Sequence, residues 1–174
     1  MVGALVESLR FVAVEQTDPL AEPLLAELTV EYAQRYGGTE AGVAAWLRGH
    51  PAEEFAAPHG ALLIGLLGGQ PVTGGAFQRF DAETAELKRI WTDSGCRQRG
   101  YAKALLVALE AVIAERGYRR IYLTTGDRQP EAEALYESAG YTRLVEPLPA
   151  GQGERSDGEK ARDIYPIAFE KVLR

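Results

Sequence analysis

The spacing of apolar residues along the chain changes repeatedly between the period of a helix and that of a strand. Helical spacing, bounded by cap residues or by glycines, covers residues 20–36, 40–48, 99–116 and 130–139. Alternating or short continuous apolar runs predict strands at residues 10–14, 61–67, 72–80, 85–92, 121–125, 141–145 and 164–172. This order of elements predicts an α/β (α+β) fold in which a mixed sheet carries helices on its faces.

Glycines mark several connections between these elements. Residues 68–71, Gly-Gly-Gln-Pro, join two strand-like runs and predict a hairpin. Gly74 and Gly75 lie inside the second run, where they indicate a β-bulge or a close backbone approach. The polar segment from Ala150 to Arg162 contains three glycines and no large apolar side chain, which predicts a mobile loop.

The run 85–92 has the period-two pattern of a strand. This alternation places every second residue on the same face, with Leu87, Arg89 and Trp91 opposite Glu86, Lys88 and Ile90. The Trp91 side chain is expected in the core rather than against a ligand, because large aromatic side chains are mostly buried.

The chain has 174 residues, of which 46% are hydrophobic and 25% charged, values typical of a folded globular protein. One domain over residues 1–174 is expected at this length. The longest apolar run, 61–67, is far shorter than the roughly 20 residues that cross a bilayer, and residues 1–10 lack a secretory pattern. The single cysteine, Cys96, excludes an internal disulfide. These features predict a cytoplasmic protein without a membrane partner.

The formal net charge is −6, from 19 Lys and Arg against 25 Asp and Glu. Nucleic acid is not an expected partner, because its binding needs a dense cationic surface. Between Glu86 and Lys103, however, five cations and two anions give a net charge of +3. This cationic island indicates one locally bound anionic ligand, or else a helix end with solvated arginines, and charge alone does not separate the two.

The segment from Arg97 to Ala102 enters the predicted helix 99–116. A helix N-terminus presents unpaired backbone N–H groups and a partial positive charge, which together suit a phosphate group. Gly100 permits close approach of a ligand, the small Ala102 leaves the first turn open, and Arg97 and Arg99 can add charge-assisted hydrogen bonds. The alternative is a tight bend in which Gly100 serves the backbone conformation only.

Residues 85–141 resemble the GCN5-related N-acetyltransferase (GNAT) family. The resemblance rests on the strand ELKRIWT, the loop RQRGYA, the helix end at Gly117, the strand IYLTTG and the segment QPEAEALYESAGY. It implies a central mixed, mostly antiparallel sheet flanked by helices on both faces. It also implies acetyl transfer from acetyl-CoA, as cosubstrate, to an amine, with no metal ion.

The resemblance further implies which residues hold acetyl-CoA. In the family, the loop binds the pyrophosphate through backbone amides, and a backbone N–H at the end of the preceding strand polarises the thioester carbonyl. The residues at the corresponding positions are Trp91, Thr92, Arg97, Gln98, Arg99, Gly100, Tyr101 and Ala102, with Gln129 where many members have Asn. Residues 85–141 are then the acetyl-CoA-binding core, and residues 15–60 border the acceptor site.

Tyr136 and Glu86 are the catalytic residues that the resemblance implies. Tyr136 lies where the family often has a tyrosine whose hydroxyl protonates the leaving thiolate, although its place on an apolar helix stripe also suits a core residue. Glu86 corresponds to a carboxylate that some members use as general base, directly or through water. The alternative for Glu86 is an ion pair with Lys88 or Arg79 on a solvated sheet face.

The expected acceptor is a primary amine of a small molecule, a peptide or a protein. Residues 15–54 contain eight acids and two bases, which favours a cationic amine unless the acids are simply the solvated face of a helix. No metal site is expected, because neither His50 nor His59 has a partner at ligand spacing. The alternative function is a non-catalytic acyl-CoA-binding sensor. The sequence leaves open which amine is used and whether the chain forms a homodimer.

Overall fold

The computed structural model describes residues 8–126, 129–149 and 166–174, and the predicted loop from Ala150 to Arg162 lies outside them. Within these ranges seven strands form one sheet in the order β1-β2-β3-β4-β5-β7-β6. The strands are β1 (Arg10–Ala13), β2 (Ala61–Leu67), β3 (Gln70–Arg79), β4 (Thr84–Thr92), β5 (Arg120–Gly126), β6 (Thr142–Arg143) and β7 (Pro166–Val172). Every neighbouring pair is antiparallel except β4 and β5, which confirms the expected mixed, mostly antiparallel sheet.

The same residues form four α-helices, α1 (Glu22–Tyr36), α2 (Glu40–Arg48), α3 (Tyr101–Glu115) and α4 (Pro130–Ser138). Helix α1 begins two residues later than predicted, because the Asp18 side chain caps a separate 3-10 turn, η1 (Pro19–Ala21), by accepting from Leu20 N at 2.8 Å. Thr39 caps α2 through Gly42 N at 3.0 Å. Two further 3-10 turns, η2 (Ala52–Phe55) and η3 (Ser94–Cys96), lie between α2 and β2 and between β4 and α3.

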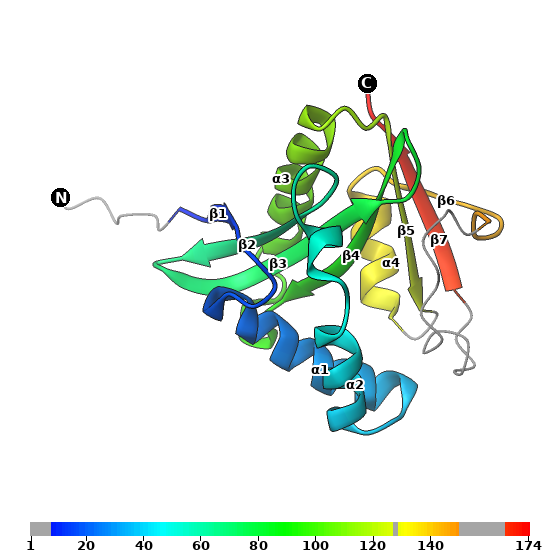
Figure 1. Ribbon diagram of the computed structural model, residues 1–174. Coiled ribbons are helices and arrows are strands. Elements are labelled where there is room, and N and C mark those ends of the chain that lie inside the picture. Colours follow the sequence, from blue (N-terminus) through cyan, green and yellow to red (C-terminus); the bar gives the residue numbers. More distant parts are fainter. Residues whose placement is uncertain (1–7, 127–128, 150–165) are drawn as a thin grey trace.

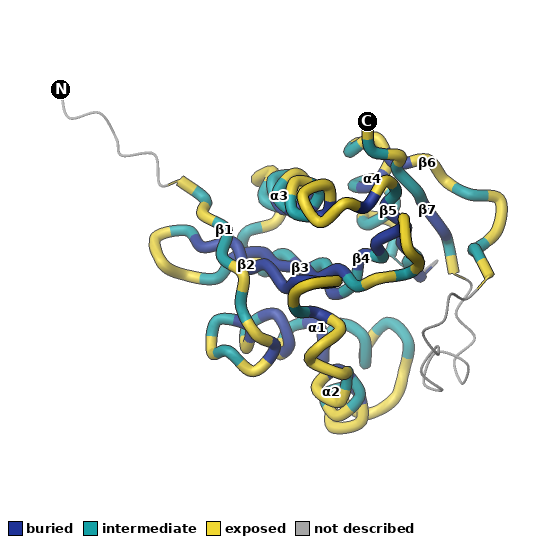
Figure 2. The backbone as a smooth tube through the Cα atoms, turned by 45° about the horizontal axis from the view of Figure 1, so that its top comes forward, coloured by how far each residue is buried: buried dark blue, intermediate teal, exposed yellow. Residues whose placement is uncertain are grey.

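The sheet separates two layers of helices, with α1 and α2 on one face and α3 and α4 on the other (Figure 1). Figure 2 shows the buried central strands between these layers. The core accordingly has two parts. Leu63 and Leu105 belong to the part under α3 and α4, whereas the neighbouring Leu62 and Ile64 pack with Leu24 under α1 and α2. Alternation along β2 therefore assigns successive side chains to opposite cores, as a strand covered on both faces requires.

A β-bulge interrupts β4 at Arg89, whose φ of 59° is left-handed. The pairing with β3 shifts register at this point, and one additional residue moves every later side chain to the other face. Leu87 consequently packs on the side of α3 and α4, whereas Trp91 packs on the side of α1 and α2. The expectation that Leu87, Arg89 and Trp91 share one face is wrong for this reason.

Glycines of β3 accommodate the bulged strand. A Cβ built at Gly75 would lie 2.6 Å from Cδ1 of Ile90, and one at Gly74 would lie 2.8 Å from Cδ1 of Ile64. Both distances are shorter than real Cβ contacts, so a side chain at either position would force Ile90 or Ile64 to move. The bulge predicted at the Gly74-Gly75 pair is confirmed, with the additional residue on the partner strand β4.

The parallel strands β4 and β5 pair only over their first residues. Their last pair joins Glu86 to Tyr122, although β4 continues to Thr92 and β5 to Gly126. Figure 1 shows the two strands diverging beyond this point. The facing edges of the two strands therefore carry backbone N–H and C=O groups that the sheet itself does not pair.

Candidate functional site

The end of β4 lies beside the separation of β4 and β5. Asp93 N donates to Val72 O of β3 at 2.8 Å. Because successive N–H groups of a strand point to opposite edges, the N–H of Thr92 faces the open edge toward β5. The Thr73 hydroxyl lies 3.2 Å from that of Thr92 and donates to Trp91 O at 2.8 Å, which holds this strand end in place. The predicted backbone donors are the N–H groups of Trp91 and Thr92. Of these, the N–H of Thr92 is the one that faces the gap, the space between the separated ends of β4 and β5.

The loop from Arg97 to Gly100 leads directly into α3. Gly100 has a φ of 82°, a left-handed conformation that glycine adopts without strain. Within the described part of the chain no side chain caps α3, so its first backbone N–H groups are available to a ligand. A Cβ built at Gly100 meets nothing within 4 Å, so the space beside the helix end is open. This open, uncapped helix N-terminus fits a phosphate group.

The side chains of this loop are exposed, but one of them already has a partner. The guanidinium of Arg97 lies 3.6 Å from Oε2 of Glu31 on α1. Gln98 has a left-handed φ of 64°, which helps to turn the chain toward the helix. Tyr101 and Ala102 form the first turn of α3 and are half-buried. The structure thus brings the predicted residues 97–102 together at one helix end.

Gln129 and Tyr36 meet on the other side of the gap. Gln129 precedes α4 and its Nε2 donates to the Tyr36 hydroxyl at 2.5 Å. The Tyr36 ring lies against Gly126 at the end of β5, where any side chain at position 126 would collide with it. Arg35, next to Tyr36, forms an ion pair with Glu131 in the first turn of α4. The predicted cofactor-binding residue Gln129 therefore also ties α1 to α4.

Tyr136 is a core residue of α4 with 5% of its surface exposed. Its ring lies 5.7 Å from the rings of Tyr141 and Phe169, centroid to centroid. Burial raises the pKa of Tyr136 well above its usual range, and the nearby Tyr32 on α1 raises it further. Its hydroxyl makes no hydrogen bond to another residue that the structure describes. The ring thus fills the core, while the hydroxyl stays protonated at neutral pH and remains available as a donor.

Glu86 is the last residue of β4 that pairs with β5, so it lies at the point where the two strands separate. Its Oε1 accepts from Nε2 of Gln78 at 3.1 Å, and its Oε2 lies 3.6 Å from Nζ of Lys88. The ion pair with Lys88, part of the alternative for this residue, is therefore present, but the solvated sheet face expected with it is not. Only 13% of the Glu86 side chain is exposed, so the carboxylate is partly desolvated and held in one orientation.

His50, in the loop after α2, lies near Gln78 and Lys88, the two residues that contact Glu86. Its Nε2 lies 2.9 Å from Oε2 of Glu54, yet the atom is buried without a hydrogen bond to any described residue, and so is Oε1 of Gln78. Burial lowers the pKa of His50 to about 4, and the charges of Arg89 and Lys88 lower it as well. His50 is therefore neutral at pH 7 and its approach to Glu54 is not an ion pair. The sequence did not predict that His50 lies near Gln78 of β3 and near Lys88 and Arg89 of β4, because these residues are far from it along the chain.

The depressed pKa of His50 predicts a loss of stability in acid. The unfolded chain binds a proton at His50 near pH 6.5, whereas the folded chain does so only near pH 4, so the stabilisation is complete above pH 6.5 and is lost as pH falls. Between pH 7 and pH 5 the free energy of unfolding should fall by about 2 kcal/mol because of His50. Urea denaturation at both pH values should show this loss reduced by that amount in His50→Asn. The exposed His59, changed to Asn, is the matched control, and an equal pH dependence in all three proteins would contradict the prediction.

Several acids of residues 15–54 are engaged within the protein. Asp18 caps η1, and Glu22 forms an ion pair with Arg48 at 2.8 Å. Glu31 lies near Arg35, at 3.2 Å, and near Arg97. Because these carboxylates neutralise groups of the chain itself, the excess of acids in this region is a weak argument for a cationic acceptor.

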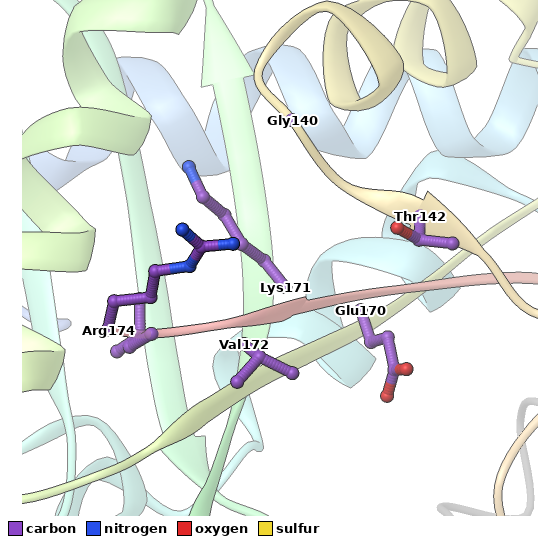
Figure 3. A pocket seen from close by; sticks show the side chains of 7 residues that line it. Gly140, Thr142, Glu170, Lys171, Val172 and Arg174 are labelled. Carbon is purple, nitrogen blue, oxygen red and sulfur yellow. The ribbon is translucent and has the colours of Figure 1, made fainter.

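A pocket of about 460 Å³ opens beside the last residues of β7. In Figure 3 the side chains of Lys171 and Arg174 extend to one side of this strand, and that of Glu170 points to the other. Val172 pairs with Arg120 at the start of β5, so the pocket lies at the end of the sheet opposite Thr92 and the loop before α3. A second pocket, of about 320 Å³, lies between α3 and α4 and reaches Lys103 in the first turn of α3.

The described residues contain neither a cluster of metal ligands nor a membrane-spanning helix. Among residues 8–126, 129–149 and 166–174, no three His, Cys, Asp or Glu side chains are grouped so as to hold a metal ion. None of the helices in these ranges is both long enough and apolar enough to cross a membrane. The Cys96 thiol is half-buried and forms no disulfide.

Comparison with known proteins identifies the class to which this arrangement belongs. The profile of the acetyltransferase (GNAT) family matches residues 24–141. The chain belongs to this family of acetyltransferases, as the resemblance over residues 85–141 predicts. The match also includes α1 and α2, for which the sequence offered only the order of elements.

Individual proteins show the same relationship. N-acetyltransferase 8 of Homo sapiens is 31% identical over 81 residues, which are 47% of this chain and about a third (34%) of that protein. The PaiA N-acetyltransferase from Thermoplasma acidophilum, in complex with coenzyme A, has 16% identity and a TM-score of 0.69 over 95% of this chain and 99% of its own. A GNAT acetyltransferase from Elizabethkingia anophelis with acetyl-CoA bound has 15% identity and a TM-score of 0.62 over 96% and 99%. At this identity the two structures show that the fold is shared.

Proposed function

We propose that this protein transfers the acetyl group of acetyl-CoA to a primary amine of a small molecule, a peptide or a protein in the cytoplasm. The observation that carries the proposal is the open, uncapped N-terminus of α3, with Gly100 in a left-handed conformation, beside the separated ends of β4 and β5. Related folds hold coenzyme A or acetyl-CoA, which supports the assignment. Residues 85–141 form the donor side of the site, and residues 15–60 form the acceptor side.

The donor is held by backbone groups at two places. The N–H groups from Gln98 to Ala102 bind the pyrophosphate, and Arg97 and Arg99 add positive charge. The N–H of Thr92 donates to the thioester carbonyl oxygen, which becomes more negative as the amine attacks. Gln129, at the start of α4, borders the pantetheine arm. The donor supplies an activated acyl group, and these residues orient it.

Glu86 is the proposed general base. An amine that is an ammonium ion in water must lose a proton in order to attack the acyl carbon. Glu86 lies where β4 and β5 separate, and Gln78 and Lys88 fix its orientation. The carboxylate takes the proton directly or through a water molecule. A nitrogen–carbon bond then forms, the carbon–sulfur bond breaks, and the sulfur leaves as a thiolate.

Tyr136 stabilises the leaving sulfur. Its raised pKa keeps the hydroxyl protonated, so it can donate a hydrogen bond to the developing thiolate. The pKa of a phenol, about 10, already exceeds that of a thiol, about 8.5, so complete proton transfer is uphill unless the site reverses this order. Hydrogen-bond donation is therefore the main contribution that we assign to Tyr136. Once the new bond has formed, the nitrogen loses a second proton, and this proton finally neutralises the thiolate.

Two measurements on the wild-type protein test the proposal. Isothermal titration calorimetry should detect binding of acetyl-CoA, and release of free thiol should accelerate with at least one member of an amine panel. Mass spectrometry of that reaction should show the acetylated amine. Binding without thiol release for any amine would favour the sensor function, and a folded protein that does not bind acetyl-CoA would overturn the proposal.

A further inference from the structure

Helix α1 crosses the open ends of β4 and β5 and contacts both sides of the gap. On the β4 side, Oε1 of Glu27 accepts hydrogen bonds from Nε1 of Trp91 at 3.0 Å and from Ser94 N at 3.1 Å. Its Oε2 accepts from Oγ of Ser94 at 2.9 Å. On the β5 side, Tyr36 binds Gln129 and covers the end of the strand. Glu27 and Tyr36 lie nine positions apart on α1, or about 13 Å along a helix, so α1 spans the gap and contacts the ends of both strands.

The Glu27 carboxylate holds the two residues that flank the end of β4. Trp91 precedes Thr92, whose N–H faces the gap, and Ser94 begins the turn that leads to the loop before α3. Three donors from these two residues converge on one carboxylate, and hydrogen bonds to a charged acceptor are stronger than neutral ones. Because Trp91 is 64 positions from Glu27 and Ser94 is 67, only the folded chain brings them together.

We infer that Glu27 is a positioning residue for the acetyl-CoA site, an inference that rests on the proposed function. The hydrogen bonds of Glu27 go to Trp91 and Ser94 and not to the loop from Arg97 to Gly100. It acts by holding Trp91 and Ser94, and thereby the Thr92 N–H between them and the start of the loop after them. Trp91 is only 2% exposed and packs in the apolar core under α1 and α2, so loss of Glu27 would leave its buried N–H without an acceptor and would free Ser94 from this strand end.

Three variants on the same helix test this inference. Glu27→Ala removes all three hydrogen bonds. Glu27→Gln has the same shape, and its amide can accept from Trp91 and Ser94 N and donate to the Ser94 hydroxyl, so it should restore most of the function. Glu22→Ala is the matched control, because it removes an ion pair of the same helix that joins α2 and not the candidate site.

Calorimetry should show that Glu27→Ala raises the Kd for acetyl-CoA about tenfold, the change expected when one or two charge-assisted hydrogen bonds no longer order the site. Glu27→Gln and Glu22→Ala should remain within about 1.5-fold of wild type. The indole N–H resonance of Trp91, assigned with Trp46→Phe, should move in Glu27→Ala and stay in place in Glu22→Ala. A merely stabilising role would lower the Tm without changing the Kd of the folded protein.

The outcomes separate this inference from the proposed function. If wild type binds acetyl-CoA and folded Glu27→Ala binds equally well, the inference is overturned and the proposed function stands. If wild type does not bind, the proposed function falls and the inference falls with it. Should Glu27→Ala not fold, Ser94→Ala removes one exposed hydroxyl only. It should raise the Kd about threefold and shift the Trp91 resonance, and an unchanged Kd would overturn the inference.

Discussion

Tyr136→Phe is expected to lower kcat by about 100-fold or more, the usual effect of losing a group that assists departure of the leaving group. The phenylalanine ring fills the same space beside Tyr141 and Phe169, so the Tm should change little. The Kd for acetyl-CoA should stay within a few fold, because the pyrophosphate contacts lie at the other helix. Steady-state kinetics with the acceptor found by the amine screen, together with calorimetry, measure all three quantities.

Tyr141→Phe is the matched control for this experiment. Tyr141 belongs to the same aromatic cluster, but its hydroxyl donates to Glu110 at 3.1 Å and has no part in the proposed chemistry. It should therefore retain the wild-type kcat even if the Tm falls. Normal turnover by Tyr136→Phe, under conditions where the chemical step limits the rate, would leave Tyr136 as a core residue and would assign the stabilisation of the sulfur to another group.

Gly100→Glu is expected to abolish measurable acetyl-CoA binding, a loss of at least about 100-fold or 2.7 kcal/mol. The new carboxylate would stand at the N-terminus of α3, in the open space that the pyrophosphate is proposed to occupy. Two negative groups would then compete for the same backbone N–H groups and repel each other. Calorimetry with acetyl-CoA measures the loss, and circular dichroism shows whether the variant is folded.

Gly100→Gln separates the charge from the backbone strain. Both variants place a side chain at a φ of 82°, which costs about 1–2 kcal/mol in either case, and their side chains have nearly the same size. Gly100→Gln should therefore bind acetyl-CoA at least about tenfold more tightly than Gly100→Glu. Equal losses in the two variants would show that strain or bulk is responsible. Normal binding by folded Gly100→Glu would place the pyrophosphate elsewhere.

The sequence predicted most of the elements because each depends on local signals. The strand 61–67 and the helix 40–48 have the predicted bounds, since the first is a continuous apolar run and the second follows a threonine cap. The loop before α3 was predicted for a related reason, because its glycine and arginines are neighbours in the sequence. The resemblance to the GNAT family implied Tyr136 and Glu86 as candidates, but the sequence did not separate core or ion-pair roles from catalytic ones.

The alternation of residues along β4 could not predict which face of the sheet the side chains after Lys88 occupy. The bulge at Arg89 arises from the pairing of β4 with β3 and from the close contact of Gly75 with Ile90. A period-two pattern contains no information about where a partner strand inserts or skips a residue. The partners of the acidic residues of α1 could not be predicted either, because those on α2, on β4 and in the loop before α3 lie far away in the sequence.

By itself, the sequence determined the order of strands and helices, the cationic loop at a helix N-terminus and, through its resemblance to GNAT proteins, the class of chemistry. These features depend on residues within one or two turns of each other, where spacing and residue type are sufficient. Only the tertiary structure decided that Thr92 rather than Trp91 presents its N–H to the gap, that His50 is half-buried and neutral, and that Glu27 holds the end of β4. Each of these depends on contacts between segments many residues apart, and such contacts exist only once the sheet has paired and α1 has packed across it.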